Sequence, residues 1–251
     1  MLSDEVVILL SIGLIAFAAG FVHSAIGFGF GIVAITLMPL LVDVRQSHVV
    51  ISTASFPVLL MATWAYRDGA DWTSLWKALL GAALFLPLGL LAFELVSIDW
   101  LTRGTGIAIL VMVWMSFRNR RKVKVSEKTA GGSSFLAGAF GGFLAGAVTI
   151  AGPPIAAYGL SQPWDQARFK AFLNQFLLAV SIYKISGLAI SGYINQETLV
   201  QSAALAPLAM VGIQIGAVFS RRLSTRRFQY FVAVALVIVA FYFVVTGAKN
   251  S

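Results

Sequence analysis

The distribution of lysine and arginine along the chain is the feature that most limits how it can fold. Long apolar segments alternate with short loops, and nearly all 18 basic residues lie in those loops. Hydrophobic residues make up 59% of the chain and charged residues only 11%, whereas a soluble domain is roughly one-quarter charged. Apolar segments of this length are typical of helices that cross a lipid bilayer. The sequence therefore predicts an all-α integral membrane protein whose main surroundings are lipid.

The apolar segments form two groups of five, separated by one strongly polar stretch. The segments are approximately 6–22, 26–42, 49–66, 75–96 and 101–117, then 134–150, 154–160, 171–190, 199–219 and 228–245. The polar stretch between the groups carries six lysines and arginines. We interpret residues 1–117 as a first membrane repeat, 118–133 as a basic cytoplasmic linker and 134–251 as a second membrane repeat. The whole chain then has 8–10 membrane segments.

The charge bias depends on whether the opening segments of each half cross the membrane or return to the side they entered. If residues 6–42 and 134–160 were straight spans, the basic loop residues would divide nine against eight. If both are hairpins, 14 basic residues lie on the linker side and three on the other. Inner-membrane proteins carry such an excess on the cytoplasmic side. We therefore expect two inverted halves, each opening with a broken or hairpin helix pair, and both termini outside.

Inverted repeats that contain broken helices are typical of secondary transporters, which bind their substrates near the bilayer midplane. The two breaks are a glycine-rich first elbow, residues 20–31, and a Gly-Pro second elbow, residues 146–154. Glycine allows a sharp turn, and the start of a half-helix attracts anions through free N–H groups and the helix dipole. Glycines that only allow close helix packing are the alternative. The candidate anion-binding residues at the elbows are His23, Ser24, Gly27, Gly29, Gly31, Thr149, Gly152 and Pro153.

Polar side chains in the second half supply further candidates. Lys184 lies inside an apolar segment with no acidic residue one turn away, so it either coordinates an anion or extends its ammonium to the membrane interface. The guanidinium of Arg168 suits an oxyanion but would also serve as an interfacial anchor. The amides either line a polar path or form ordinary interhelical hydrogen bonds. These candidates are Arg168, Asn174, Gln175, Lys184 and Gln214.

The sequence also argues against several classes of function. The chain has no cysteine and only two histidines, without an HExxH pair. It shows neither a nucleophilic serine motif nor a Walker phosphate loop. We therefore expect no catalytic residue, no metal site, no cofactor and no enzymatic activity. Because the basic residues lie in loops and form no basic face, we expect no binding of nucleic acid.

Over essentially its whole length the chain resembles the TauE/SafE family of sulfite and organosulfonate permeases. The resemblance rests on its size, its duplicated layout and the two elbows, although Phe28 and Phe30 separate glycines that family members usually hold in a tighter run. It implies a multi-pass transporter in the bacterial cytoplasmic (inner) membrane for small anions such as sulfite, organosulfonates or short carboxylates. Export by alternating access is the leading interpretation. A passive anion channel and a membrane-embedded assembly factor or enzyme are the alternatives, and a coupling proton or sodium ion and a homodimer stay open.

Overall fold

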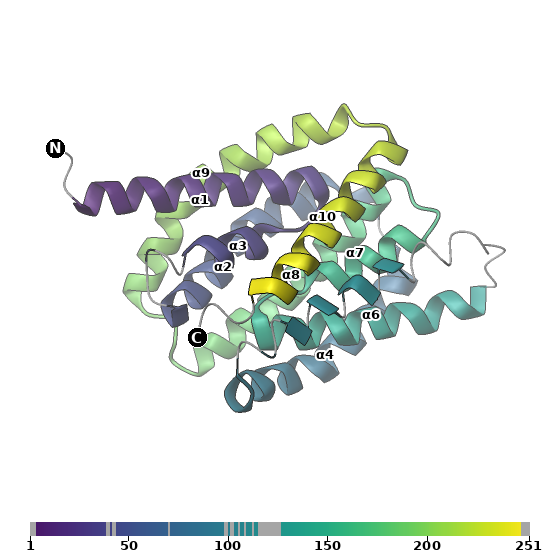
Figure 1. Ribbon diagram of the computed structural model, residues 1–251, viewed down its shortest axis with the longest axis horizontal. Helices are drawn as coiled ribbons and strands as arrows, with labels where there is room; N and C mark the ends of the chain where they lie inside the picture. Colours follow the sequence, from purple (N-terminus) through teal and green to yellow (C-terminus); the bar gives the residue numbers. More distant parts are fainter. Residues whose placement is uncertain are drawn as a thin grey trace. The chain divides into compact units, whose positions relative to one another are not determined.

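The computed structural model is built from α-helices joined by short connections (Figure 1). It describes residues 4–38, 41, 44–69, 71–97 and 127–246, with scattered positions between 100 and 114. Within these ranges there is no β-strand, which confirms the all-α expectation. The helices are α1 (Asp4–Ile26), α2 (Phe30–Leu37), α3 (Val44–Ala65), α4 (Trp72–Leu95), α6 (Glu127–Val148), α7 (Gly152–Ser161), α8 (Gln166–Ile190), α9 (Gln196–Arg221) and α10 (Thr225–Thr246), with a 3-10 turn η2 (Arg67–Gly69).

Several of these helices have the length and composition of membrane spans. In the described part of the chain, four helices qualify: α4, α8, α9 and α10. Shorter apolar stretches lie in α1, α3 and α6. Helix α6 begins at Glu127, inside the stretch that we interpret as the linker. Eight of the 17 residues of the segment predicted over 101–117, and the first part of the linker, lie outside the described residues.

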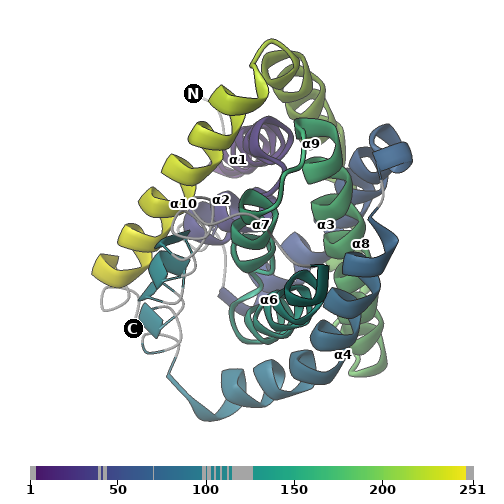
Figure 2. The ribbon, with the colours of Figure 1, turned by 90° about the vertical axis from the view of Figure 1, so that its right-hand side faces the viewer.

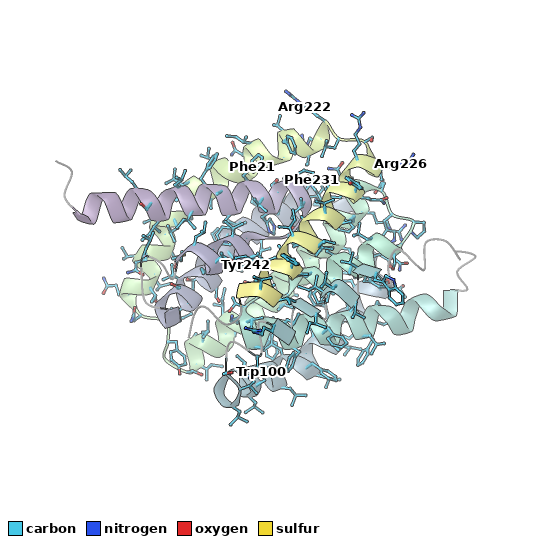
Figure 3. All side chains as sticks on the ribbon, in the orientation of Figure 1. Phe21, Trp100, Arg222, Arg226, Phe231 and Tyr242 are labelled. Atoms are coloured by element: carbon cyan, nitrogen blue, oxygen red, sulfur yellow. The ribbon has the colours of Figure 1, made fainter. Side chains whose placement is uncertain are left out.

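Helix α10 shows how the helices meet an apolar environment. Large apolar side chains remain exposed along it, including Phe231 at 46% and Ile238 at 63%. Arginines lie at its start: Arg222 precedes the helix and Arg226 lies in its first turn, and both side chains extend away from the ribbon (Figure 3). Exposed apolar sides with charge only at the helix end fit a helix whose outer surface is covered by lipid.

The chain folds into two compact units that do not coincide with the two halves of the sequence. The first unit contains residues 1–65 and 181–223, and the second contains residues 66–180 and 224–251. Each unit therefore takes helices from both halves, and α8 passes from the second unit into the first. The division into repeats concerns duplication of the sequence, so it stays a prediction.

In the first unit, α1 packs lengthwise against α9 (Figure 1). The glycines of both helices face the backbone of the other: a Cβ added at Gly20 or Gly212 would overlap the carbonyl oxygen of Ala209 or Phe17, respectively. Residue numbers at the contacts rise in the same direction along both helices, so α1 and α9 run parallel. Close packing through small residues is the usual way in which helices associate in membranes.

The second unit contains a matching pair, α4 and α6, with α7 against α6 (Figure 2). Here Gly138, Gly142 and Gly146 of α6 face the backbone of α4 at Ala78, Ala82 and Leu86. This pair is also parallel. The helix that opens one half of the sequence thus packs against the fourth helix of the other half, once in each unit.

Candidate functional site

The first elbow joins α1 to α2 in the first unit. Helix α1 ends at Ile26, and both Gly27 (φ 92°) and Gly29 (φ 116°) adopt left-handed backbone conformations that favour glycine. His23 and Ser24 lie in the last turns of α1 and are buried. The Gly27 N–H donates a hydrogen bond to the His23 carbonyl at 2.7 Å, which closes the end of the helix. The break predicted at these glycines is therefore present.

Helix α2 begins at this elbow without a side-chain cap. Its N-cap residue is Gly29, which has no side chain that could cap the first turn. The first N–H groups of a helix have no partner within the helix and lie at the positive end of its dipole. The start of α2, which includes Phe30 and Gly31, can therefore offer backbone donors to an anion.

The second elbow joins α6 to α7 in the second unit. Helix α6 ends at Val148, and Thr149 follows with a left-handed backbone (φ 62°), which is unfavourable for a β-branched residue. Helix α7 then begins at Gly152, and its residues from Gly152 to Leu160 are all buried. Strained backbone of this kind is concentrated at functional sites, which is a reason to keep Thr149 as a candidate.

The two elbows differ in the number of donors they can offer. Pro153 and Pro154 occupy the first turn of α7, and proline has no backbone N–H. Gly152 is then the one residue of that turn before Ile155 that carries an N–H group. The two elbows, predicted to play the same role, therefore differ: every residue in the first turn of α2 carries an N–H group, whereas two residues in that of α7 are prolines. The second contributes mainly its dipole and the Gly152 N–H.

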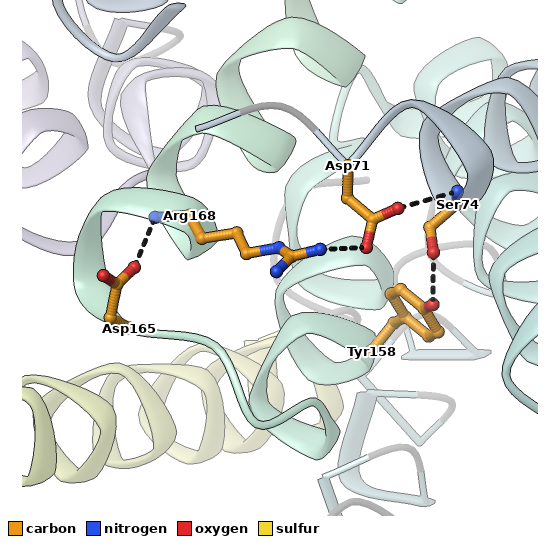
Figure 4. Close-up of polar contacts among 5 residues, drawn as sticks. All are labelled: Asp71, Ser74, Tyr158, Asp165 and Arg168. Atoms are coloured by element: carbon orange, nitrogen blue, oxygen red, sulfur yellow. Dashed lines mark hydrogen bonds and ion pairs between the residues drawn. The ribbon is translucent and has the colours of Figure 1, made fainter. Parts of the chain in front are cut away.

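Arg168 lies at the start of α8, where it forms an ion pair (Figure 4). Its Nη2 donates to Oδ2 of Asp71 at 3.1 Å, and its backbone N–H donates to Oδ1 of Asp165 at 2.8 Å. Asp71 also accepts a hydrogen bond from the Ser74 N–H at 3.2 Å and so caps α4. The guanidinium is half exposed. Its partner here is a carboxylate, and its role toward a substrate stays a prediction.

The other candidates on α8 and α9 lie in different surroundings. Asn174 is buried, and its Nδ2 donates to the Lys170 carbonyl at 2.7 Å. Gln175 buries its Oε1 atom, which has no hydrogen-bond partner among the described residues. Lys184 is partly exposed, and Gln214 is exposed on α9. Asn174 and Gln175 belong to the second unit and Lys184 and Gln214 to the first.

Asp71 and Tyr158 were not among the candidates predicted from the sequence. The Tyr158 hydroxyl donates to Oγ of Ser74 at 3.1 Å, so that α7 is linked to the start of α4 (Figure 4). Asp71 could have been found, because an aspartate three residues before a serine and directly before an apolar run is typical of a helix N-cap. Nothing in the sequence indicated the partner of Tyr158, which is distant along the chain.

The model of the sulfite exporter TauE/SafE family matches residues 12–243, so the chain belongs to this family of multi-pass membrane transporters and is not an enzyme. A protein of Cupriavidus necator described as "probable sulfite/organosulfonate exporter TauE" is 22% identical over 225 residues, which cover 87% of this chain and 88% of that protein. No solved structure matches the chain.

Proposed function

We propose that this protein is a secondary transporter that exports a small anion, such as sulfite, an organosulfonate or a short carboxylate, across the bacterial inner membrane. Family membership supports the class of substrate. The observation that carries the proposal is the first elbow, where two left-handed glycines follow the buried end of α1 and α2 starts at a glycine N-cap without a side-chain cap. In a membrane, such irregular backbone persists where protein or a water-filled cavity satisfies its polar groups.

The contacts of the second unit support the hairpin arrangement of residues 134–160. Asp71, in the turn before α4, pairs with Arg168, in the first turn of α8. If residues 134–160 were a straight span, these two turns would lie on opposite sides of the membrane. A hairpin brings them to the same side, which is also the arrangement that gives the strong positive-inside bias.

The exchange of helices between the halves supports the inverted repeat and alternating access. Duplication predicts that α1 corresponds to α6 and that α4 corresponds to α9. The parallel pairs α1–α9 and α4–α6 are then the same contact made twice, once within each unit. Convergence of the two elbows near the midplane, which the repeat predicts, stays a prediction.

The second elbow is tested by adding side chains of increasing size at Gly152. Gly29 is less suitable, because φ of 116° strains any other residue and a Cβ there would lie 2.9 Å from Val22 Cγ1. If the Gly152 N–H contacts the anion, Gly152→Ala should weaken binding roughly tenfold, about 1.4 kcal/mol, and Gly152→Leu more strongly. Thermal stabilisation by sulfite in detergent measures binding, and the melting temperature without anion measures packing.

The control for this series is Gly104→Leu. A Cβ at Gly104 meets no heavy atom of the described residues within 4 Å, so this variant should keep both stability and stabilisation by sulfite. If the Gly152 variants are stabilised by sulfite as strongly as the wild type, the second elbow is a packing device and the anion binds elsewhere.

Lys184→Met tests the lysine inside α8. If the ammonium pairs with the anion, affinity should fall by roughly 10- to 100-fold while the protein stays monodisperse. If affinity is unchanged, the side chain extends to the membrane interface, which its partial exposure also allows. Isothermal titration with sulfite separates the two results.

Counterflow in proteoliposomes tests the transport function as a whole. Vesicles loaded with unlabelled sulfite, methanesulfonate or acetate should accumulate the labelled anion transiently, because a carrier exchanges anions through one site. A passive channel gives flux without such an overshoot. Imposed proton and sodium gradients then identify the coupling ion, and light scattering determines whether the purified protein is a monomer or a homodimer.

A further inference from the structure

Lys170 is a fully buried cation near the start of α8. Its side chain has an exposed fraction of 0%, and its Nζ lies 5.3 Å from the ring centroids of both Tyr66 and Phe228. The Nζ also donates to the Tyr66 hydroxyl at 3.5 Å. Burying an ammonium is costly, and aromatic faces and hydroxyls offset part of that cost. If this position served only for packing, an apolar side chain would fill it without the desolvation cost of a lysine.

The two rings that enclose the Lys170 ammonium, Tyr66 and Phe228, lie close to two places where the chain passes from one unit to the other. Tyr66 is the first residue after the part of the first unit that ends with α3, and Phe228 lies in the first turn of α10, just after the chain re-enters the second unit at Ser224. Lys170 therefore holds both connections against one helix, α8.

Further contacts repeat this arrangement. The Asp71–Arg168 ion pair attaches the first connection to α8. Nε2 of Gln229 donates to the Trp164 carbonyl at 3.2 Å, and the Phe169 ring meets the Phe228 ring edge-on at 5.5 Å. These bonds attach the second connection to the same helix and to the turn before it. A polar and aromatic cluster thus joins all three segments, at the side of the membrane that the charge distribution predicts to be cytoplasmic.

We propose that these contacts form a latch with Lys170 at its centre. The latch holds this face of the transporter closed and opens once in each transport cycle. The proposal rests on the proposed function, because alternating access requires the contacts at one face to break and re-form. Chemistry favours the role: a caged ammonium that leaves its aromatic rings regains its hydration, so opening costs less than separating apolar surfaces of the same size. Interfaces with two discrete arrangements are the usual basis of such switching.

A disulfide across the latch tests whether it opens. A Cβ on Gly69 would lie 3.0 Å from the Ala171 Cβ, close to the separation of about 3.5–4.5 Å that a disulfide requires. The double variant Gly69→Cys/Ala171→Cys, in a chain without other cysteines, should lose anion counterflow on oxidation and regain it on reduction. Equal counterflow in the oxidised and reduced forms would overturn the proposal.

Thiol labelling gives a second measurement that needs no transport activity. Ala171 is fully buried beside Lys170, so Ala171→Cys reacts with a maleimide when the latch is open. Adding Lys170→Met should raise its labelling rate about tenfold, and Lys170→Arg should raise it less because it keeps a cation over the rings. If the wild type transports none of the anions, the proposed function fails. The labelling rates of the Ala171→Cys variants still show whether the latch opens and whether Lys170 holds it closed.

The matched control is Ala240→Cys, which is equally buried on α10 but lies about 18 Å along the helix from Phe228. Lys170→Met should leave its labelling rate unchanged. If both rates rise together, or neither rises, Lys170 supports general packing and the latch is overturned.

Discussion

Replacing Gly138 by alanine is expected to destabilise the protein by at least about 3 kcal/mol and to leave little monodisperse material in detergent. The added Cβ would overlap the Ala78 carbonyl oxygen and would lie 2.5 Å from the Ala78 Cα. Backbone in the middle of a helix cannot rotate away as a side chain can, so α4 and α6 would have to separate. Thermal unfolding followed by size-exclusion chromatography measures the effect.

Gly187→Ala on α8 is the matched control. A Cβ there meets no heavy atom within 4 Å, so stability should be unchanged or should rise by about 0.5–1 kcal/mol through the better helix propensity of alanine. Equal melting temperatures for the Gly138 and Gly187 variants would show that α4 and α6 do not pack closely through Gly138.

Single cysteines on the three connections of the second unit are expected to react from one side of the membrane. Arg67 and Arg226 are exposed, so Arg67→Cys, Arg168→Cys and Arg226→Cys should all react with an impermeant maleimide from the cytoplasm. Arg120→Cys in the linker should do the same. Tyr193→Cys, in the turn between α8 and α9 and 55% exposed, should react from outside. The native chain has no cysteine to interfere.

Each cysteine is labelled by the impermeant reagent from one side of the membrane only, so the side of labelling gives the topology directly. Labelling of the Arg120 and Arg226 variants from opposite sides would show that the hairpin model is wrong. Labelling of the Arg67 and Arg168 variants from opposite sides would contradict the Asp71–Arg168 ion pair itself.

Local features of the chain were predictable from the sequence because their causes are local. Helix and apolar length depend on neighbouring residues, so the all-α membrane architecture followed from composition and spacing. The left-handed conformations at Gly27 and Gly29 need glycine, so the first elbow was visible as a glycine-rich break. The sequence also indicated the family through the same elbows.

The tertiary structure decided which helices meet and therefore what individual residues do. Gly138 could be recognised as a small residue, but only the pairing of α6 with α4 shows that Ala78 leaves no room for a Cβ. By sequence, Lys170 counted as one of the basic residues in a cytoplasmic loop, whereas packing of α8 against Tyr66 and Phe228 buries it completely. Periodicity and propensity act over a few residues, while these contacts join segments far apart in the chain, so no local pattern encodes them.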